Sequence, residues 1–262
     1  MNNLKKIKNY IRSNYLFREE FDLNKLSDYF SGDKFSNYLY FKFPKQKKVL
    51  DRDTFVIDLV KNKRNIHVGC VDHNSELIDQ KIKEGTYFHK KLIDNSKFCM
   101  GIDINALGID YMKEVLKYDN VYCVDLIKEP FAKVKESKFN FLILGEIIEH
   151  VDNPYYFLKK LNDYYKENVE KVVITTPNAF SYRNFKNTSK GLEGINSDHK
   201  SQFSPFTLSK ILYLAGFRNL EINFTNPCDS FFQKSLNILF GRKIFYKKSS
   251  LSETLIIVAD FK

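Results

Sequence analysis

The chain has 262 residues, 43% of them hydrophobic and 15% aromatic, and a formal net charge of +10. This length suits one large domain, or one domain with a small cap. The basic N-terminal stretch MNNLKKIKNYIRSNY lacks the apolar core of a secretory signal, and no stretch reaches the length of a membrane span. The four cysteines form no CxxC pair, which indicates a reducing, cytoplasmic setting.

The lysines are dispersed along the chain and accompanied by many acids. This distribution favours a solvated lysine-rich surface over an anionic partner. The partners that stay open are a phosphorylated or nucleotide-linked acceptor, an acidic membrane surface contacted peripherally and, less readily, nucleic acid.

Before residue 64 the sequence predicts short charged helices at residues 3–14, 22–30 and 52–62, and one short strand at residues 38–43. After residue 64 strands and helices alternate. The predicted strands cover residues 65–68, 98–104, 121–124, 139–144, 171–175, 220–224 and 254–261. The predicted helices cover residues 76–93, 107–118, 154–166 and 205–215. A loop runs from residue 175 to about residue 204, and Gly216 ends the last helix as its C′ residue.

This alternation predicts an α/β fold with a doubly wound, mostly parallel sheet. The last two strands lack a clear crossover helix between them, which predicts an antiparallel edge. We expect residues 1–64 to form a helical N-terminal cap and residues 65–262 to form the main domain. Within it, residues 229–240 predict an amphipathic helix packed on the sheet. The alternative is a lid insertion at residues 228–250, over substrate or touching a lipid-linked acceptor.

Polar residues follow the predicted strands at their carboxyl ends, where open α/β sheets bind ligands. Gly69 ends the first strand at a turn that lets the backbone approach a ligand, although the GxGxxG pattern of dinucleotide sites is absent. Asp103 ends the second strand and could accept hydrogen bonds from both hydroxyls of a ribose. Asp125 ends the third and could accept one from an adenine amino group. A helix N-cap is the alternative for each aspartate.

The most informative stretch is FNFLILGEIIEHVDNP, which predicts a buried strand that stops at Gly145 and turns directly into a helix. In that helix Glu146, Glu149 and His150 would stand at i, i+3 and i+4, on one face. Two carboxylates and an imidazole beside a ligand crevice are costly unless they bind something. The alternative is a helix start whose acidic residues favour the N-terminal dipole.

Together these motifs resemble the class I S-adenosylmethionine-dependent methyltransferases, over roughly residues 65–224. The motifs are HVGCVDH, GIDIN, CVDL, FNFLILGEIIEHVDNP, ITTPN and FSPFTLSKILYLAGF. The resemblance implies a Rossmann-like sheet of seven strands, one of them antiparallel, and the cofactor S-adenosyl-L-methionine. The resemblance implies that Gly69, Cys70 and Val71 contact the methionine end of this cofactor, and that Asp103 and Ile104 contact its ribose. It also implies that Asp125 and Leu126 contact the adenine, and that Gly145 and Glu146 lie next to the sulfonium.

Two departures from the family pattern concern the methionine pocket. The acidic residue expected two positions before the first glycine is His67 here, and the usual GxG is Gly69-Cys70-Val71. The gap between Gly69 and Asp103 is also long, which implies an extra turn or insertion after the first strand.

A hydroxyl acceptor needs a general base or a metal that lowers its pKa. The ExxEH pattern with a later histidine resembles the metal-dependent RNA 2′-O-methyltransferases, and some ubiquinone-pathway O-methyltransferases carry a similar ExxEH. The implied ligands of Mg²⁺, Mn²⁺, Fe²⁺ or Zn²⁺ are Glu146, Glu149, His150 and His199. An EH pair also occurs in family members without a metal. In that case His199 is the preferred catalytic base, Asp198 its orienting partner, and His150 the second choice.

The remaining candidates flank these motifs. His73 could face the cofactor or the acceptor, whereas His89 fits a structural role. Tyr182 and Arg183 could line the acceptor pocket, where Arg183 would meet a phosphate. Ordinary polar residues of a surface loop are the alternative for this pair.

Three functions remain open. The first is O-methylation of a sugar or other small hydroxyl acceptor, in polysaccharide biosynthesis such as bacterial surface-glycan or capsule assembly. The second is a metal-dependent nucleic-acid methyltransferase acting on RNA ribose, which we would expect to carry a concentrated basic channel with stacking aromatics. The third is a non-catalytic cofactor-binding protein with a Rossmann-like fold. We rank them in that order.

Overall fold

The structure is a computed structural model, and it describes residues 23–41, 43, 46–227 and 249–262. The chain divides into two compact units, residues 1–48 and residues 49–262. The described part of the first unit contains the 3-10 turn η1 (Leu23–Leu26) and the helix α2 (Ser27–Ser31). Helix α3 (Arg52–Val60) belongs to the second unit. The division into a helical cap at residues 1–64 and a main domain at residues 65–262 stays a prediction. Among the described residues, no helix combines the length and apolarity that crossing a bilayer requires.

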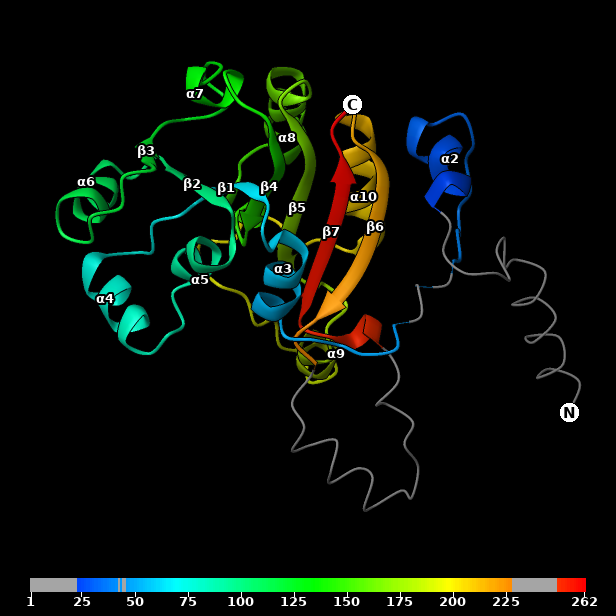
Figure 1. The fold of residues 1–262 in the computed structure, drawn as a ribbon. Helices are drawn as coiled ribbons and strands as arrows, with labels where there is room; N and C mark the ends of the chain where they lie inside the picture. Colours follow the sequence, from blue (N-terminus) through cyan, green and yellow to red (C-terminus); the bar gives the residue numbers. More distant parts are fainter. Residues whose placement is uncertain (1–22, 42, 44–45, 228–248) are drawn as a thin grey trace, which may run out of the picture. The chain divides into compact units, whose positions relative to one another are not determined.

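The second unit is built on a sheet of seven strands in the order β3-β2-β1-β4-β5-β7-β6 (Figure 1). The parallel strands on one side are β1 (Arg64–Val68), β2 (Phe98–Asp103), β3 (Val121–Cys123), β4 (Phe139–Gly145) and β5 (Val169–Pro177). Strand β7 (Thr254–Asp260) lies antiparallel between β5 and the edge strand β6 (Arg218–Thr225). The predicted α/β class, with its antiparallel edge, is confirmed.

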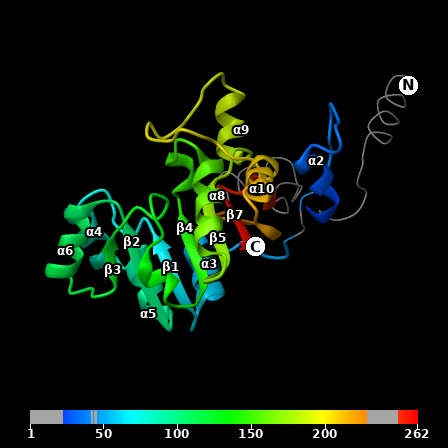
Figure 2. The same cartoon turned by 90° about the horizontal axis from the view of Figure 1, so that it is seen from above.

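Both faces of this sheet are buried, which explains the unbroken apolar runs in the sequence. Phe141 and Ile143 of β4 pack with apolar residues of α3 and α5 (Phe88–Asn95). The alternate residues Leu142 and Leu144 point to the other face and are fully buried. That face carries α8 (Pro154–Tyr165) and α10 (Pro205–Leu214), as Figures 1 and 2 show.

Side-chain caps begin several of the described helices. Asn74, Asn105, Asn153 and Ser204 each accept a hydrogen bond from the backbone N–H three residues later. They start α4 (Ser75–Lys83), α6 (Ala106–Glu114), α8 and α10. Helix α10 ends before Gly216, whose φ is +104°, so the predicted left-handed glycine is confirmed.

The structure corrects several local predictions. Residues 76–93 form two helices, because the chain turns at Gly85 with a φ of +66°. Among the described residues of 38–43 there is no strand. The predicted loop after β5 contains α9 (Tyr182–Thr188), and α7 (Ala132–Lys135) was not predicted because four residues carry no periodicity. The helices predicted at residues 3–14 and 229–240 lie outside the described residues. So does the candidate lid at residues 228–250, except for its last two residues, which begin the 3-10 turn η3 (Ser249–Leu251).

Candidate active site

A cavity of about 1050 Å³ opens at the carboxyl ends of β1 to β4. These ends lie level, because Val68 pairs with Ile102 on one side and with Leu144 on the other. The strand order reverses between β1 and β4, the position at which doubly wound sheets form their ligand crevice. The predicted site residues that line the cavity are Gly69, Cys70, Val71, His73, Asp103, Ile104, Asp125, Leu126, Gly145, Glu146, His150, Asp198 and His199.

The backbone of the turn after β1 lies close to the end of β2 and to the side chain of Ile147. Gly69 has a φ of +75°, and a Cβ at this position would overlap the side chain of Ile147. The N–H groups of Gly69 and Cys70 both donate to the Ile102 carbonyl, at 2.8 and 3.3 Å. Glycine is therefore favoured here by its conformation, and a larger residue would also have to displace the Ile147 side chain.

Asp103 ties this turn to the end of β2. Its Oδ2 accepts the Val71 N–H and its Oδ1 accepts the Asn105 N–H, each at 2.9 Å. Each carboxylate oxygen retains a further lone pair for a ligand. The N-cap of α6 is Asn105, so capping does not explain Asp103.

Asp125 and Leu126 form the wall beyond β3. Asp125 Oδ1 accepts the Ile127 N–H at 3.1 Å, which makes a local turn and not a helix cap. Leu126 is buried, and its carbonyl accepts a hydrogen bond from the Tyr165 hydroxyl at 3.1 Å. Ile104 stands at the rim with 76% of its surface exposed. The wall therefore offers one carboxylate and an apolar surface.

The turn after β4 does not continue into a helix, and that prediction was wrong. Glu146 has a φ of +56°, and only the 3-10 turn η2 (Ile148–His150) precedes α8. The Glu146 N–H donates to the Thr175 carbonyl at 3.0 Å, and the Thr175 hydroxyl donates to Glu146 Oε1 at 2.8 Å. These bonds to β5 hold the left-handed residue in place, so Glu146, Glu149 and His150 do not form one face of a helix.

Glu149 is a buried carboxyl group with an incomplete set of partners. It is 1% exposed, and its Oε2 accepts a hydrogen bond from the Thr176 hydroxyl at 3.0 Å. Its Oε1 has no partner among the described residues. Burial, followed by the neighbouring Glu146 carboxylate, raises the pKa of Glu149 to about 8. Without a cation this carboxyl group carries a proton at neutral pH.

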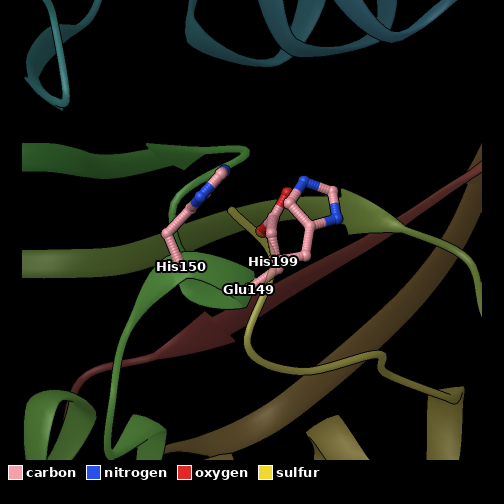
Figure 3. Close-up of side chains that lie close together, drawn as sticks. All are labelled: Glu149, His150 and His199. Carbon is pink, nitrogen blue, oxygen red and sulfur yellow. The ribbon is translucent and has the colours of Figure 1, made fainter. Parts of the chain in front are cut away.

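His150 and His199 meet beside Glu149 although they are far apart in sequence (Figure 3). The N–H groups of Lys200 and Ser201 donate to the Glu149 carbonyl at 2.8 and 3.2 Å, which docks the loop that carries His199. The two imidazole rings pack edge to face with centroids 4.7 Å apart. One ligand atom from each of Glu149, His150 and His199 lies within 4.8 Å of the others.

The backbone of Asp198 contacts His150, and the role of Asp198 as the orienting partner of His199 stays a prediction. The Asp198 backbone carbonyl lies 3.2 Å from His150 Nδ1, so Nδ1–H donates and Nε2 keeps a free lone pair. The Asp198 carboxylate accepts a hydrogen bond from Ser197, at 3.3 Å. Burial, and then the nearby His150, lower the pKa of His199, which keeps that imidazole neutral and able to donate a lone pair to an ion or to accept a proton.

The model of the family described as "Methyltransferase domain" matches residues 53–222. The chain belongs to the class I S-adenosylmethionine-dependent methyltransferases. No curated protein matches it. Its fold is similar to that of the small RNA methyltransferase HEN1, with a TM-score of 0.53 and 13% identity, over 84% of this chain and 27% of that one.

Two further solved structures are similar to this methyltransferase. One is the methyltransferase domain of bacterial CtHen1, with a TM-score of 0.50 and 17% identity over 80% of this chain and 97% of the other. The second is a SAM-dependent methyltransferase from Archaeoglobus fulgidus, with a TM-score of 0.49 and 21% identity over 80% of this chain and 91% of the other.

The other predicted residues of the methyltransferase lie at differing distances from the cavity. His73 is exposed and lines it. Tyr182 and Arg183 begin α9 and are not among the described residues that line it. The Arg183 guanidinium contacts the Glu253 carboxylate at 3.2 Å.

Two residues of the candidate site were not predicted. Arg52 of α3 lines the cavity, and its Nη1 lies 3.8 Å from Glu146 Oε1. No sequence signal marks it, because α3 precedes the first strand. Thr176 supplies the hydrogen bond to Glu149, and its place at the end of the apolar run of β5 could have indicated it.

Proposed function

We propose that this methyltransferase transfers a methyl group from S-adenosyl-L-methionine to a hydroxyl of a sugar or other small acceptor that carries adjacent hydroxyls. We propose further that Glu149, His150 and His199 hold a divalent cation beside that acceptor. The observation that supports the proposal is the convergence of these three side chains on one point, with ligand atoms within 4.8 Å of one another.

In the proposal the cofactor occupies the cavity at the strand ends. Gly69, Cys70 and Val71 would hold its methionine end, Asp103 its ribose hydroxyls with Ile104 at the rim, and Asp125 with Leu126 its adenine. Gly145 and Glu146 would then lie near the sulfonium. The support is the bare backbone at Gly69 and the lone pairs that Asp103 and Asp125 keep toward the cavity.

The chemistry of the three ligands fits a cation. Glu149 Oε1 is buried without a described partner, and a bound cation would replace the proton on this carboxyl group. The backbone bond at Nδ1 of His150 leaves Nε2 free. Two imidazoles and one carboxylate suit Mn²⁺, Fe²⁺ or Zn²⁺ better than Mg²⁺. When bound, such an ion lowers the pKa of a coordinated hydroxyl and can orient a diol.

Glu146 was predicted as a fourth metal ligand, but in the proposal it does not bind the cation directly. It is not in the group of close ligand atoms, and its Oε1 accepts the Thr175 hydroxyl. In the proposal the negative charge of Glu146, beside the three ligands, raises the affinity of the site for a cation. If no metal binds, His199 is the general base, since its neutral imidazole is beside the cavity.

The charge around the cavity favours an uncharged acceptor. Its lining contains three basic side chains, Arg52, Lys81 and Lys200. Each forms an ion pair with an acid, respectively with Asp53, Asp72 and Asp152. Because these cations are already neutralised, they attract a phosphate chain less strongly than free cations would. A sugar is therefore preferred to a phosphorylated acceptor, and a cytoplasmic step in surface-glycan or capsule assembly belongs to the proposal.

The second candidate is an RNA ribose methyltransferase. It is favoured by the two glutamates and two histidines in the pattern ExxEH with a later histidine. The two similar folds described as small RNA methyltransferase HEN1 and bacterial CtHen1 support no more than the fold. In this alternative, Tyr182 and Arg183 would contact the RNA strand outside the cavity.

Paired acceptors test the proposal. We expect methyl transfer from radiolabelled S-adenosylmethionine to a glycoside with adjacent hydroxyls, loss of transfer to the matching deoxy glycoside, and loss with chelator. Transfer only to RNA, falling steeply as salt rises, would favour the second candidate. Methyl transfer that a chelator does not reduce would exclude a metal from the reaction, and His199 would then be the general base.

A further inference from the structure

The floor of the cleft contains two buried histidines that the proposed transfer does not use. His67, at the end of β1, is 4% exposed, and His89, on α5, is 1% exposed. Their Nδ1 atoms lie 3.1 Å apart, and their rings stack with centroids 5.2 Å apart. Both residues line the cavity, with His67 Nε2 3.7 Å from where a Cβ on Gly145 would lie. Burying two imidazoles is costly unless they bind something.

The surrounding residues make room for this pair. A Cβ on Gly101 of β2 would lie 2.7 Å from His89 Nε2, so glycine is what admits the imidazole. The ring of Phe88 packs edge to face on His67, with centroids 5.3 Å apart. The Arg52 guanidinium lies over the Phe88 ring, 4.7 Å from its centroid. The arrangement fixes both rings.

Both imidazoles are neutral. Burial lowers the pKa of His89 to about 3. Burial, and then the nearby His89 and Arg52, hold the pKa of His67 well below its ordinary value. Two neutral rings whose Nδ1 atoms face each other share one proton between these atoms. The pair therefore has two possible arrangements of tautomers.

The unpartnered atom of His89 decides between them. His89 Nε2 is buried and has no partner among the described residues. If His67 donated at Nδ1, His89 would carry a proton on Nε2 as an orphaned buried N–H, which proteins rarely tolerate. If His89 donates at Nδ1, its Nε2 is a bare lone pair, and His67 carries its proton on Nε2 instead. The second arrangement is favoured.

We propose that the Nε2–H of His67 donates a hydrogen bond to the carboxylate of the methionine part of S-adenosylmethionine, and that His89 is the positioning residue that fixes this tautomer. The proposal rests on the binding of this cofactor in the cleft. The acidic residue that the family resemblance leads one to expect at position 67 would attract the cofactor's ammonium group. This chain presents a hydrogen-bond donor there in place of a carboxylate, and so favours the cofactor's carboxylate.

Calorimetric titration of the full chain with three ligands tests the assignment. S-adenosylhomocysteine carries the carboxylate and the ammonium, decarboxylated S-adenosylmethionine carries only the ammonium, and 5′-methylthioadenosine carries neither. In His67→Phe we expect S-adenosylhomocysteine to bind roughly 10-fold to 100-fold more weakly, since a hydrogen bond to a charged group is lost. The other two ligands should bind as they do to the unaltered protein.

Each other outcome has a definite meaning. Weaker binding of decarboxylated S-adenosylmethionine as well, with 5′-methylthioadenosine unchanged, would show that His67 accepts from the ammonium and would overturn the proposal. Equal weakening of all three ligands would reduce His67 to a structural role. If none bound the unaltered protein, the assignment of the cleft to the cofactor would itself be wrong.

Tautomers can be measured without any variant, should His67→Phe fail to fold. In ¹⁵N-histidine NMR spectra of the unaltered protein, we expect His67 protonated at Nε2 and His89 at Nδ1. Addition of S-adenosylhomocysteine should shift the His67 Nε2 signal, and 5′-methylthioadenosine should leave it in place. The opposite tautomers, or equal shifts with both ligands, would overturn the proposal.

Discussion

Replacing Glu149 by glutamine should stabilise the metal-free protein while removing its response to metal. The folded-state pKa of about 8 lies above the ordinary value of 4.5, because the buried group resists ionisation. For an acid with a raised pKa, folding takes up a proton, and the resulting destabilisation begins as pH rises above 4.5 and is complete near pH 8. At pH 7 it amounts to about 3 kcal/mol. Glutamine has the shape of the protonated acid and does not ionise.

Thermal unfolding in chelator should therefore show Glu149→Gln more stable than the unaltered protein at pH 7, by roughly 6–12 °C for a chain of this size. The two curves should converge near pH 4.5. Added Mn²⁺ should raise the melting temperature of the unaltered protein and leave the variant unchanged. Glu114→Gln, at an exposed position on α6, is the matched control and should follow the unaltered protein. A difference that does not change with pH, or a variant still stabilised by Mn²⁺, would refute the reasoning.

Three further predictions follow from the same site. Gly69→Ala should abolish binding of S-adenosylhomocysteine in calorimetry and lower stability, because the left-handed backbone and the Ile147 side chain exclude a Cβ; normal affinity would contradict this. Asp103→Asn should weaken that binding roughly tenfold, because hydrogen bonds to a charged acceptor are the stronger ones; an unchanged affinity would remove Asp103 from the ribose site. The affinity for Mn²⁺ should rise between pH 6 and pH 8, as the proton on Glu149 is more easily displaced; a pH-independent affinity would exclude Glu149 as a ligand.

The strands after residue 64 and the ligand edge of the sheet could be predicted because the signals are local. Apolar runs such as Phe139–Gly145 are required by a sheet covered on both faces, and Gly69, Asp103 and Asp125 follow directly at the strand ends. Their level alignment follows from parallel pairing. The same local signals do not reveal short elements such as α7.

The turn after β4 shows what the sequence could not reveal. The residues GEIIEH satisfy a helical spacing, yet two bonds to Thr175 hold Glu146 in a left-handed conformation. Those bonds come from β5, which is distant in sequence. The meeting of His199 with Glu149 likewise depends on backbone bonds from residues 200–201. The resemblance indicated the candidate ligands, and the proximity of Glu149, His150 and His199 depends on tertiary contacts.

The central claim is that Glu149, His150 and His199 bind a divalent cation in a methyltransferase cleft. Titration of Mn²⁺ into chelator-treated protein, followed by the loss of the free Mn²⁺ electron paramagnetic resonance signal, tests it most directly. We expect one bound ion per chain, lost in Glu149→Gln and in His199→Phe and retained in Glu114→Gln. An absence of bound Mn²⁺, or equal binding by all four proteins, would contradict the claim.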